Sequence, residues 1–219
     1  MKILKLVLII LVLETTLSGT TDSEKSSETK AKIDAKSCTH ETVENDPTGL
    51  RLYTLKKRLK VYLSQNNEAP KIQTLIAVRA GSKYDLADNT GLAHYLEHMV
   101  FMGTDNIGIQ DFEKEAVYLK KISNLYEAHK AENNLEKKIT TYKEIDNVSQ
   151  EASKISIPKA CDKMVSSLRA EETNAFTSNE QTVYVNKIPA NELGSWLNLE
   201  SKRFSKLILR FSYSVRNYF

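Results

Sequence analysis

Two histidines and a glutamate stand within five residues of one another in the segment His94-Tyr95-Leu96-Glu97-His98. On an α-helix, positions 94, 97 and 98 are three and four residues apart, so their side chains share one face. Two neutral imidazoles on adjacent turns can bind one zinc ion, and a nearby carboxylate can take a proton from water that the metal has made acidic. The segment therefore predicts a zinc site with His94 and His98 as ligands and Glu97 beside them.

The residues around this segment distinguish a metal site from the alternative, a solvated helix face that carries two histidines and a glutamate. They are almost all apolar, which predicts a buried helix: Leu92, Ala93, Leu96, Met99, Val100 and Phe101. Ionisable groups on a buried helix require a partner, because burying them unpaired is costly. A metal ion is the simplest partner for all three groups, and zinc is the cofactor that the pattern favours.

The rest of the chain predicts the elements that position this helix. A Ser/Thr/Lys/Glu-rich stretch ends near residue 48, and β-prone and helical runs follow it. Strands, then helices, then strands indicate an α+β fold, a mostly antiparallel sheet with helices packed on one face. We expect a β-hairpin over 52–55 and 59–63, a strand over 72–80, a helix over 91–101 capped by Thr90, a surface helical hairpin over 111–131 and 135–149, strands over 174–177 and 182–185, and an amphipathic helix over 191–206.

The first residues indicate export. Two early lysines precede the apolar run Leu6 to Leu13, and small residues follow Glu14, which is the order of a secretory signal peptide over residues 1–19. The alternative is a buried strand or helix at a domain edge. Residues 20–48 are too polar to bury a core, so we expect a flexible tether there. These features predict a periplasmic or extracellular protein that meets a membrane only during export.

Charge and cysteine content exclude some other functions. The net charge is only +3 and the basic residues are scattered, so the chain lacks the basic patch that nucleic-acid binding requires. Cys38 and Cys161 are the only cysteines and have no CxxC spacing, which argues against a thiolate zinc site. Whether the two form a disulfide is left open.

Three blocks of sequence carry a resemblance to a known family. Gly91 to Thr104 (GLAHYLEHMVFMGT) resembles the inverted zincin signature of the pitrilysin, insulin-degrading enzyme and mitochondrial processing peptidase family. Residues 78–82 resemble the strand and turn before that helix. Residues 174–178, followed by 181–184, resemble the strand pair beside the active site. The resemblance covers about residues 49 to 210 and marks 49–219 as a peptidase N-terminal domain, with the helical hairpin inserted at about 109–151.

The resemblance implies a zinc metalloendopeptidase that cleaves peptides or unfolded segments. His94 and His98 would be zinc ligands, and Glu97 would be the general base. Asn174, Ala175 and Phe176 would lie on an edge strand that binds the substrate as an added β-strand. For Phe176 and Tyr184, a place in the sheet core is an equal alternative. The expected partners are a peptide substrate and a second peptidase half or subunit.

The chain also departs from the family pattern. A catalytic zinc needs a third protein ligand, which the family supplies as a glutamate on a later helix. Residues 211–219 (FSYSVRNYF) contain no carboxylate, and Glu192 and Glu200 correspond to the preceding helix. We therefore expect a truncated, inactive chain with no third ligand. One codon choice for that tail, shifted by one base, encodes Phe-His-Thr-Ala-Leu-Glu-Ile, so we hypothesise a frameshift.

Three further positions carry charged side chains where the family commonly has glycine. They are Arg58 in the first hairpin turn, and Arg169 and Glu172 before the second strand pair. Glycine is used where φ must be positive or where the backbone must approach another group closely. Three functions stay open: a peptidase completed by another chain, a non-catalytic peptide-binding homologue or partner subunit, and a decayed fragment.

Overall fold

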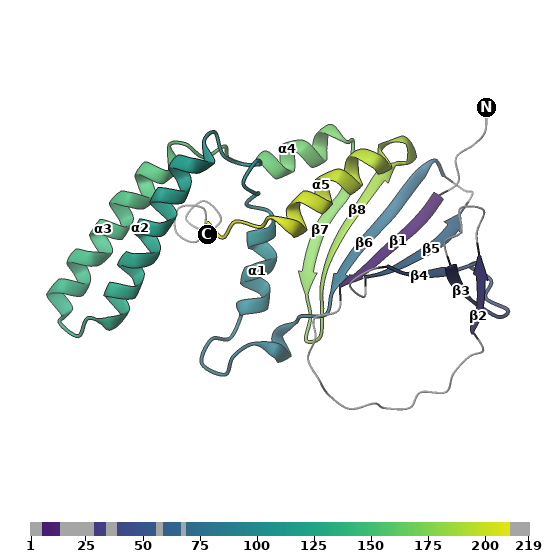
Figure 1. The fold of residues 1–219 in the computed structure, drawn as a ribbon, viewed down its shortest axis with the longest axis horizontal. Helices are drawn as coiled ribbons and strands as arrows, with labels where there is room; N and C mark the ends of the chain where they lie inside the picture. The colour runs from purple at the N-terminus through teal and green to yellow at the C-terminus, as the bar shows by residue number, and fades with distance from the viewer. Residues whose placement is uncertain (1–5, 14–28, 34–38, 56–58, 67–68, 211–219) are drawn as a thin grey trace. The chain divides into compact units, whose positions relative to one another are not determined.

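The computed structural model describes residues 6–13, 29–33, 39–55, 59–66 and 69–210 (Figure 1). The chain divides into two compact units. The first contains residues 1–97 and 165–197, and the second contains residues 98–164 and 198–219. The first unit is mainly β-sheet and the second is helical, which confirms the predicted α+β class.

The first unit is built on an eight-stranded sheet with the order β2-β3-β4-β5-β1-β6-β8-β7. Neighbouring strands are antiparallel except β1 and β6, which are parallel, so the expected mostly antiparallel sheet is present. The strands are β1 (Leu6–Leu13), β2 (Thr29–Ile33), β3 (Thr39–Val43), β4 (Arg51–Thr54), β5 (Lys60–Asn66), β6 (Lys71–Val78), β7 (Glu171–Thr177) and β8 (Thr182–Pro189).

Alternation of side chains explains why β6 lies inside the sheet. Ile72, Thr74 and Ile76 are buried and alternate with half-buried residues, as expected when a strand has one face on the core. The hydroxyl of Thr74 donates a 3.0 Å hydrogen bond to the carbonyl of Asn186 on β8, which satisfies this buried polar group. The predicted hairpin of β4 and β5 is also present, with Tyr53 opposite Val61.

The N-terminal region differs from the expected flexible tether. Within residues 20–48, β2 pairs with β3 and β3 pairs with β4, so these segments extend the sheet. Backbone hydrogen bonds can add such strands to an edge without the large apolar residues on which the tether prediction was based. His40 on β3 is buried, and its ring lies 5.1 Å from that of Tyr53. Residues 20–28 and 34–38 of the expected tether lie outside the described residues.

The apolar run near the N-terminus forms β1, between β5 and β6. Leu6 to Val12 pair with β5, and Ile9 to Leu13 pair with β6. This pairing describes the chain before any cleavage of the predicted signal peptide. The signal peptide stays a prediction, and no helix in the described part of the chain is long and apolar enough to span a membrane.

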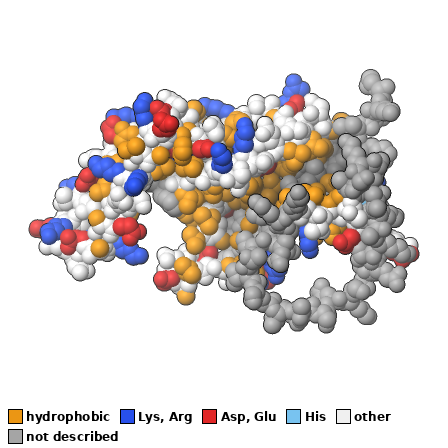
Figure 2. All heavy atoms as spheres, viewed as in Figure 1, with side chains coloured by type: hydrophobic (Ala, Val, Ile, Leu, Met, Phe, Trp, Pro, Cys, Tyr) orange, Lys and Arg blue, Asp and Glu red, His pale blue; other side chains and the backbone are white. Residues whose placement is uncertain are grey.

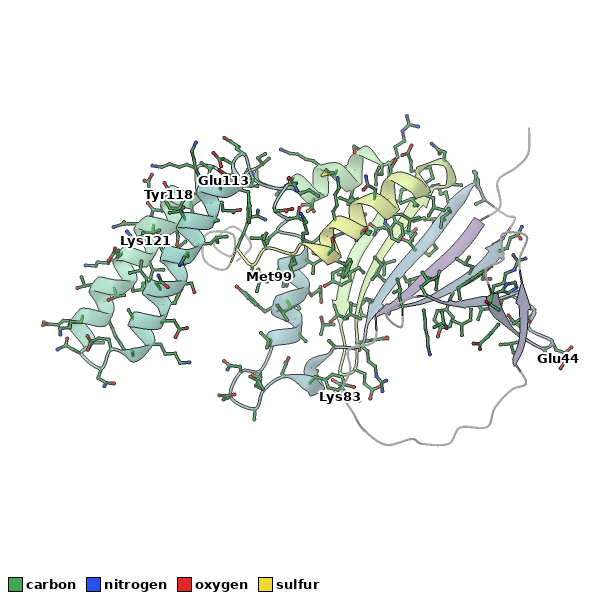
Figure 3. The ribbon with its side chains drawn as sticks, viewed as in Figure 1. Glu44, Lys83, Met99, Glu113, Tyr118 and Lys121 are labelled. Atoms are coloured by element: carbon green, nitrogen blue, oxygen red, sulfur yellow. The ribbon has the colours of Figure 1, made fainter. Side chains whose placement is uncertain are left out.

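A tight turn follows β6. The backbone N–H groups of Ser82 and Lys83 donate to the carbonyls of Ser178 and Asn179 in the β7–β8 turn, each at 3.0 Å. Lys83, labelled in Figure 3, also forms an ion pair with Glu180. A Cβ atom on Gly81 would lie 2.4 Å from the carbonyl oxygen of Ser178, so only glycine permits this close approach.

The helices begin where local side chains can cap them. They are α1 (Leu92–Val100), α2 (Phe112–Ala131), α3 (Leu135–Ser153), α4 (Ala160–Ser167) and α5 (Leu193–Ser205). Asp111 accepts a hydrogen bond from the backbone N–H of Lys114, and Asn134 accepts one from that of Lys137, each at 3.1 Å. The predicted helical hairpin is therefore α2 and α3, whereas α4 was not predicted.

The helical hairpin has a small apolar core and a charged surface. Ile122, Val148 and Ala152 form the core, with Tyr118 of α2 packed against it (Figure 3). Val117 and Leu135 are each 71% exposed. Figure 2 shows many Lys, Arg, Asp and Glu side chains on the surface of these helices. The hairpin therefore matches the expected surface element with a solvated face.

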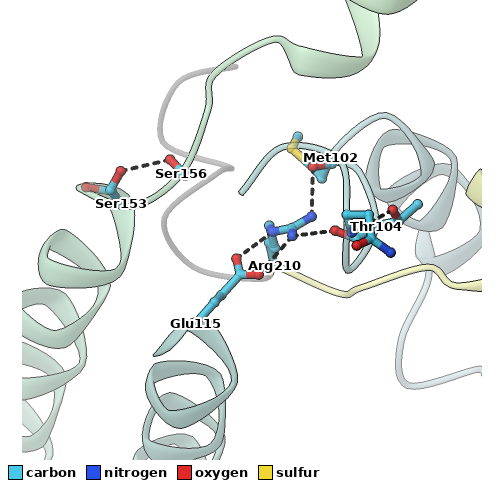
Figure 4. A network of polar contacts seen from close by, with 7 residues as sticks. Met102, Thr104, Glu115, Ser153, Ser156 and Arg210 are labelled. Carbon is cyan, nitrogen blue, oxygen red and sulfur yellow. Dashed lines mark hydrogen bonds and ion pairs between the residues drawn. The ribbon is translucent and has the colours of Figure 1, made fainter. Parts of the chain in front are cut away.

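A buried ion pair joins the end of the described chain to the start of α2. Arg210 is 1% exposed and donates to both carboxylate oxygens of Glu115, at 2.5 and 2.8 Å (Figure 4). It also donates to the carbonyls of Met102, at 2.9 Å, and Thr104, at 2.8 Å.

In the same unit, Cys161 is a free, buried thiol, and burial raises its pKa. Cys38, the other cysteine of the disulfide left open above, lies outside the described residues.

Candidate zinc-binding helix

Helix α1 carries the candidate site and is capped from outside. The two carboxylate oxygens of Asp85 accept hydrogen bonds from the backbone N–H groups of Gly91, at 2.7 Å, and Ala93, at 2.8 Å. The first N–H groups of a helix have no partner within the helix, and a carboxylate also interacts favourably with the positive end of the helix dipole. The expected cap, Thr90, is replaced in this role by Asp85 because the preceding loop folds back to the helix.

The three candidate side chains have different environments. His94 and His98 are exposed, whereas Glu97 is only 6% exposed. All three lie on one continuous helix, at the spacing that places them on one face. Two imidazoles are therefore open to solvent, and the carboxylate between them is buried.

The expectation of a wholly buried helix is wrong. Leu92 is 40% exposed and Leu96 is 38% exposed, while Met99 and Val100 are buried. The helix is apolar in composition, but only part of its circumference is covered. Met99 is labelled on α1 in Figure 3. The partial exposure suits a functional helix, because ligands and substrate must reach the histidines.

The buried carboxylate of Glu97 has a defined partner within the first unit. The hydroxyl of Thr177, at the end of β7, donates a hydrogen bond to its Oε2 at 2.5 Å. The same hydroxyl oxygen lies 3.1 Å from that of Thr182 on β8, and Thr182 donates to the carbonyl of Ala80 at 2.9 Å. Sequence reasoning missed Thr177 as a functional residue, although it lies in the Asn-Ala-Phe-Thr-Ser block that carried the resemblance.

The residues of α1 fit two of the three protein ligands of a zinc site. Imidazoles four residues apart on a helix can bind one zinc ion. In the described ranges, no group of three or more His, Cys, Asp or Glu side chains is placed to hold a metal ion. Glu200 forms a buried 2.7 Å ion pair with Arg203, and burial raises the pKa of Glu200.

The predicted substrate-binding residues lie on an edge strand. Strand β7 is the last in the sheet order and pairs with β8, with Asn174 opposite Val185 and Phe176 opposite Val183. Asn174 is exposed, Ala175 is half-buried and Phe176 is 47% exposed. Tyr184 is 4% exposed and belongs to the core, so the two aromatic residues have different environments.

The backbone before this strand takes the conformation that glycine favours. Arg169 has φ = 54° and Glu172 has φ = 51°, in the left-handed region where most side chains are strained. The pairing of β7 with β8 is irregular between Glu171 and Asn174. The positive φ angles agree with the expectation that these positions suit glycine, and Arg58 lies outside the described residues.

An α+β domain with an inverted His-x-x-Glu-His helix and an exposed edge strand has the features of a metallopeptidase domain. Residues 60–124 match the family model described as insulinase, peptidase family M16. That segment includes the His94–His98 helix turn. Over these residues the chain is similar to this peptidase family, which supports the resemblance that its sequence motifs carry.

Several relatives are similar over parts of the chain. A protein of Arabidopsis thaliana named "Probable mitochondrial-processing peptidase subunit beta, mitochondrial" is 35% identical over 65 residues, which is 30% of this chain and 12% of the relative. A Schizosaccharomyces pombe protein named "Probable mitochondrial-processing peptidase subunit beta" is 34% identical over 88 residues, 36% of this chain and 19% of the relative. A Dictyostelium discoideum insulin-degrading enzyme homologue is 31% identical over 75 residues, 34% of this chain and 8% of the relative. The chain therefore matches less than a fifth of each relative's length.

Proposed function

We propose that this chain is the zinc-site part of a metalloendopeptidase that acts on peptides or unfolded segments. The observation that carries the proposal is the arrangement on α1, where the buried Glu97 is positioned by a hydrogen bond and His94 and His98 are open to solvent on the same helix. The alternative is a solvated helix face, on which Glu97 would be exposed together with the two histidines.

The residues would divide the work of peptide hydrolysis. His94 and His98 would hold zinc, which supplies positive charge to activate water and polarise the scissile carbonyl. Glu97 would accept the proton of the attacking water and pass it to the leaving amine. The exposed backbone of β7 at Asn174 and Phe176 would pair with the substrate as an added strand, which requires little sequence specificity.

The same residues support a chain that is inactive in isolation. Two imidazoles without a carboxylate ligand should bind zinc weakly and should not support turnover. We propose that a second peptidase half or a partner subunit completes the zinc site. Export to the periplasm or outside the cell, directed by residues 1–19, is part of the proposal.

A second candidate function is peptide binding without catalysis. The exposed edge strand favours it, because main-chain pairing with a peptide does not need zinc. The name of two relatives, a mitochondrial-processing peptidase subunit, is compatible with a role as one subunit among several.

Metal analysis of the purified chain, combined with cleavage of a quenched peptide, tests these functions. For the isolated chain we expect weak zinc binding that His94→Ala abolishes, and no cleavage. Tight zinc with cleavage that Glu97→Gln removes, and that Glu127→Gln on the surface of α2 leaves intact, would show that the chain is complete by itself. Peptide binding that is unchanged by His94→Ala would support the second function, and zinc binding unaffected by His94→Ala would refute the site.

A further inference from the structure

We propose that Thr177 is a positioning residue that fixes the orientation of the Glu97 carboxylate and couples it to the substrate-binding strand. This inference rests on the proposed function of Glu97 as the base and of β7 as the substrate strand. Its geometry, however, can be tested without zinc and without turnover.

The proton of Thr177 is available to Glu97 whichever acceptor Thr182 uses. A threonine hydroxyl has a single proton to donate. Thr182 can give its own proton to the carbonyl of Ala80, at 2.9 Å, or to Thr177, at 3.1 Å. In both cases the proton of Thr177 remains available for the Oε2 of Glu97, at 2.5 Å. Thr182 and Ala80 therefore support the hydroxyl that holds the carboxylate.

This contact should restrict the carboxylate strongly. Hydrogen bonds to an ionised acceptor are shorter and stronger than neutral ones, and Glu97 is buried. The hydroxyl itself is well fixed, because threonine is β-branched and rotates little about χ1. A catalytic side chain must be held close to its productive geometry by such supporting contacts.

The position of Thr177 in the chain gives the contact a further consequence. It directly follows Asn174, Ala175 and Phe176, the segment proposed to pair with substrate. A peptide paired in register with this strand would therefore lie at a fixed offset from the base. Strand pairing, which is insensitive to side chains, would thus place the scissile bond relative to Glu97.

A neighbouring threonine provides the matched control. Thr173 lies on the same strand and donates a 3.1 Å hydrogen bond to Oδ1 of Asn186, without contacting Glu97. Thr173→Val and Thr177→Val therefore remove equivalent hydroxyls from β7. Only the second change removes a contact with the proposed base. Thr177→Ser restores the hydroxyl and tests whether the hydrogen bond, rather than the shape of the side chain, is responsible.

The experiment is carbon-13 NMR of the glutamate side chains in the metal-free, full 219-residue chain. The Glu97 carboxylate resonance is assigned by its loss in Glu97→Gln, and three-bond couplings report its side-chain rotamer. We expect one fixed rotamer in the wild type, Thr177→Ser and Thr173→Val. In Thr177→Val we expect a shifted carboxylate resonance and couplings averaged over rotamers.

Each outcome decides the proposal. A folded Thr177→Val chain with the wild-type resonance and couplings would overturn it, as would Thr177→Ser behaving like Thr177→Val. If Thr177→Val does not fold, Thr177→Ala breaks the same contact with less disturbance, and the same comparison applies. If the wild-type chain does not bind zinc but the variants show this NMR pattern, the proposed function is refuted. The positioning contact between Thr177 and Glu97 then still stands.

Discussion

Replacing Arg210 with methionine should strongly destabilise the second unit. Arg210 and Glu115 are 1% and 0% exposed, respectively, and Arg210 donates two hydrogen bonds to Glu115 and two more to backbone carbonyls. Methionine preserves much of the volume of the side chain but provides no donor. It therefore leaves a buried carboxylate without its arginine, together with the carbonyls of Met102 and Thr104.

The size of the effect follows from the burial of both charges. Breaking a buried ion pair by removing one partner costs about 3–5 kcal/mol, because the remaining charge cannot reach water. For a chain of this size, that loss corresponds to a fall in melting temperature of roughly 6–20 °C. Removing both charges, in Arg210→Met with Glu115→Gln, should cost less than the sum of the two single changes.

Urea unfolding followed by far-UV circular dichroism measures this, because the second unit contains the long helices α2 and α3. Lys206→Met is the matched control: Lys206 forms a 2.8 Å ion pair with Asp105 at the surface of the same unit, and the change should leave the midpoint almost unchanged. The reasoning is refuted if Arg210→Met unfolds at the wild-type midpoint, or if the two single changes are simply additive.

Two further predictions concern backbone strain and pH. Glu172→Gly should stabilise the chain by about 1 kcal/mol or less, because glycine accepts φ = 51° without strain. The control is Glu171→Gly at the neighbouring position, which should lower the melting temperature. Equal effects of the two changes on the melting temperature would contradict this prediction. The hydrogen bond from the backbone N–H of Lys114 lowers the pKa of Asp111 below its usual 3.8, so the stability that this charge adds is present above pH 3.8 and lost as pH falls through the lower folded value. Thermal unfolding of the wild type and of Asp111→Asn, which cannot titrate, should therefore differ at pH 6 and converge near pH 2, and a difference that persists at low pH would refute the assignment.

The sequence by itself determined the features that depend on local spacing. The three- and four-residue intervals among His94, Glu97 and His98 place these side chains on one face of any helix. The apolar run over 72–80 predicted β6, and Lys, Glu, Leu and Tyr at helical spacing over 111–131 and 135–149 predicted the helical hairpin. These features arise from periodicity and from contacts within a few residues, so they can be derived without the fold.

Only the tertiary structure decided which of these side chains are covered and which partners they meet. The sequence cannot show that α1 is half exposed, because its apolar residues point in several directions and the covered face is set by distant elements. The bond between Thr177 and Glu97 joins residues 80 positions apart, and that between Arg210 and Glu115 joins residues 95 positions apart. Outer strands of the sheet such as β2 and its neighbour β3 are held by backbone pairing, which has no side-chain signature. Contacts of this kind depend on how the chain folds back on itself, and local sequence patterns do not encode that.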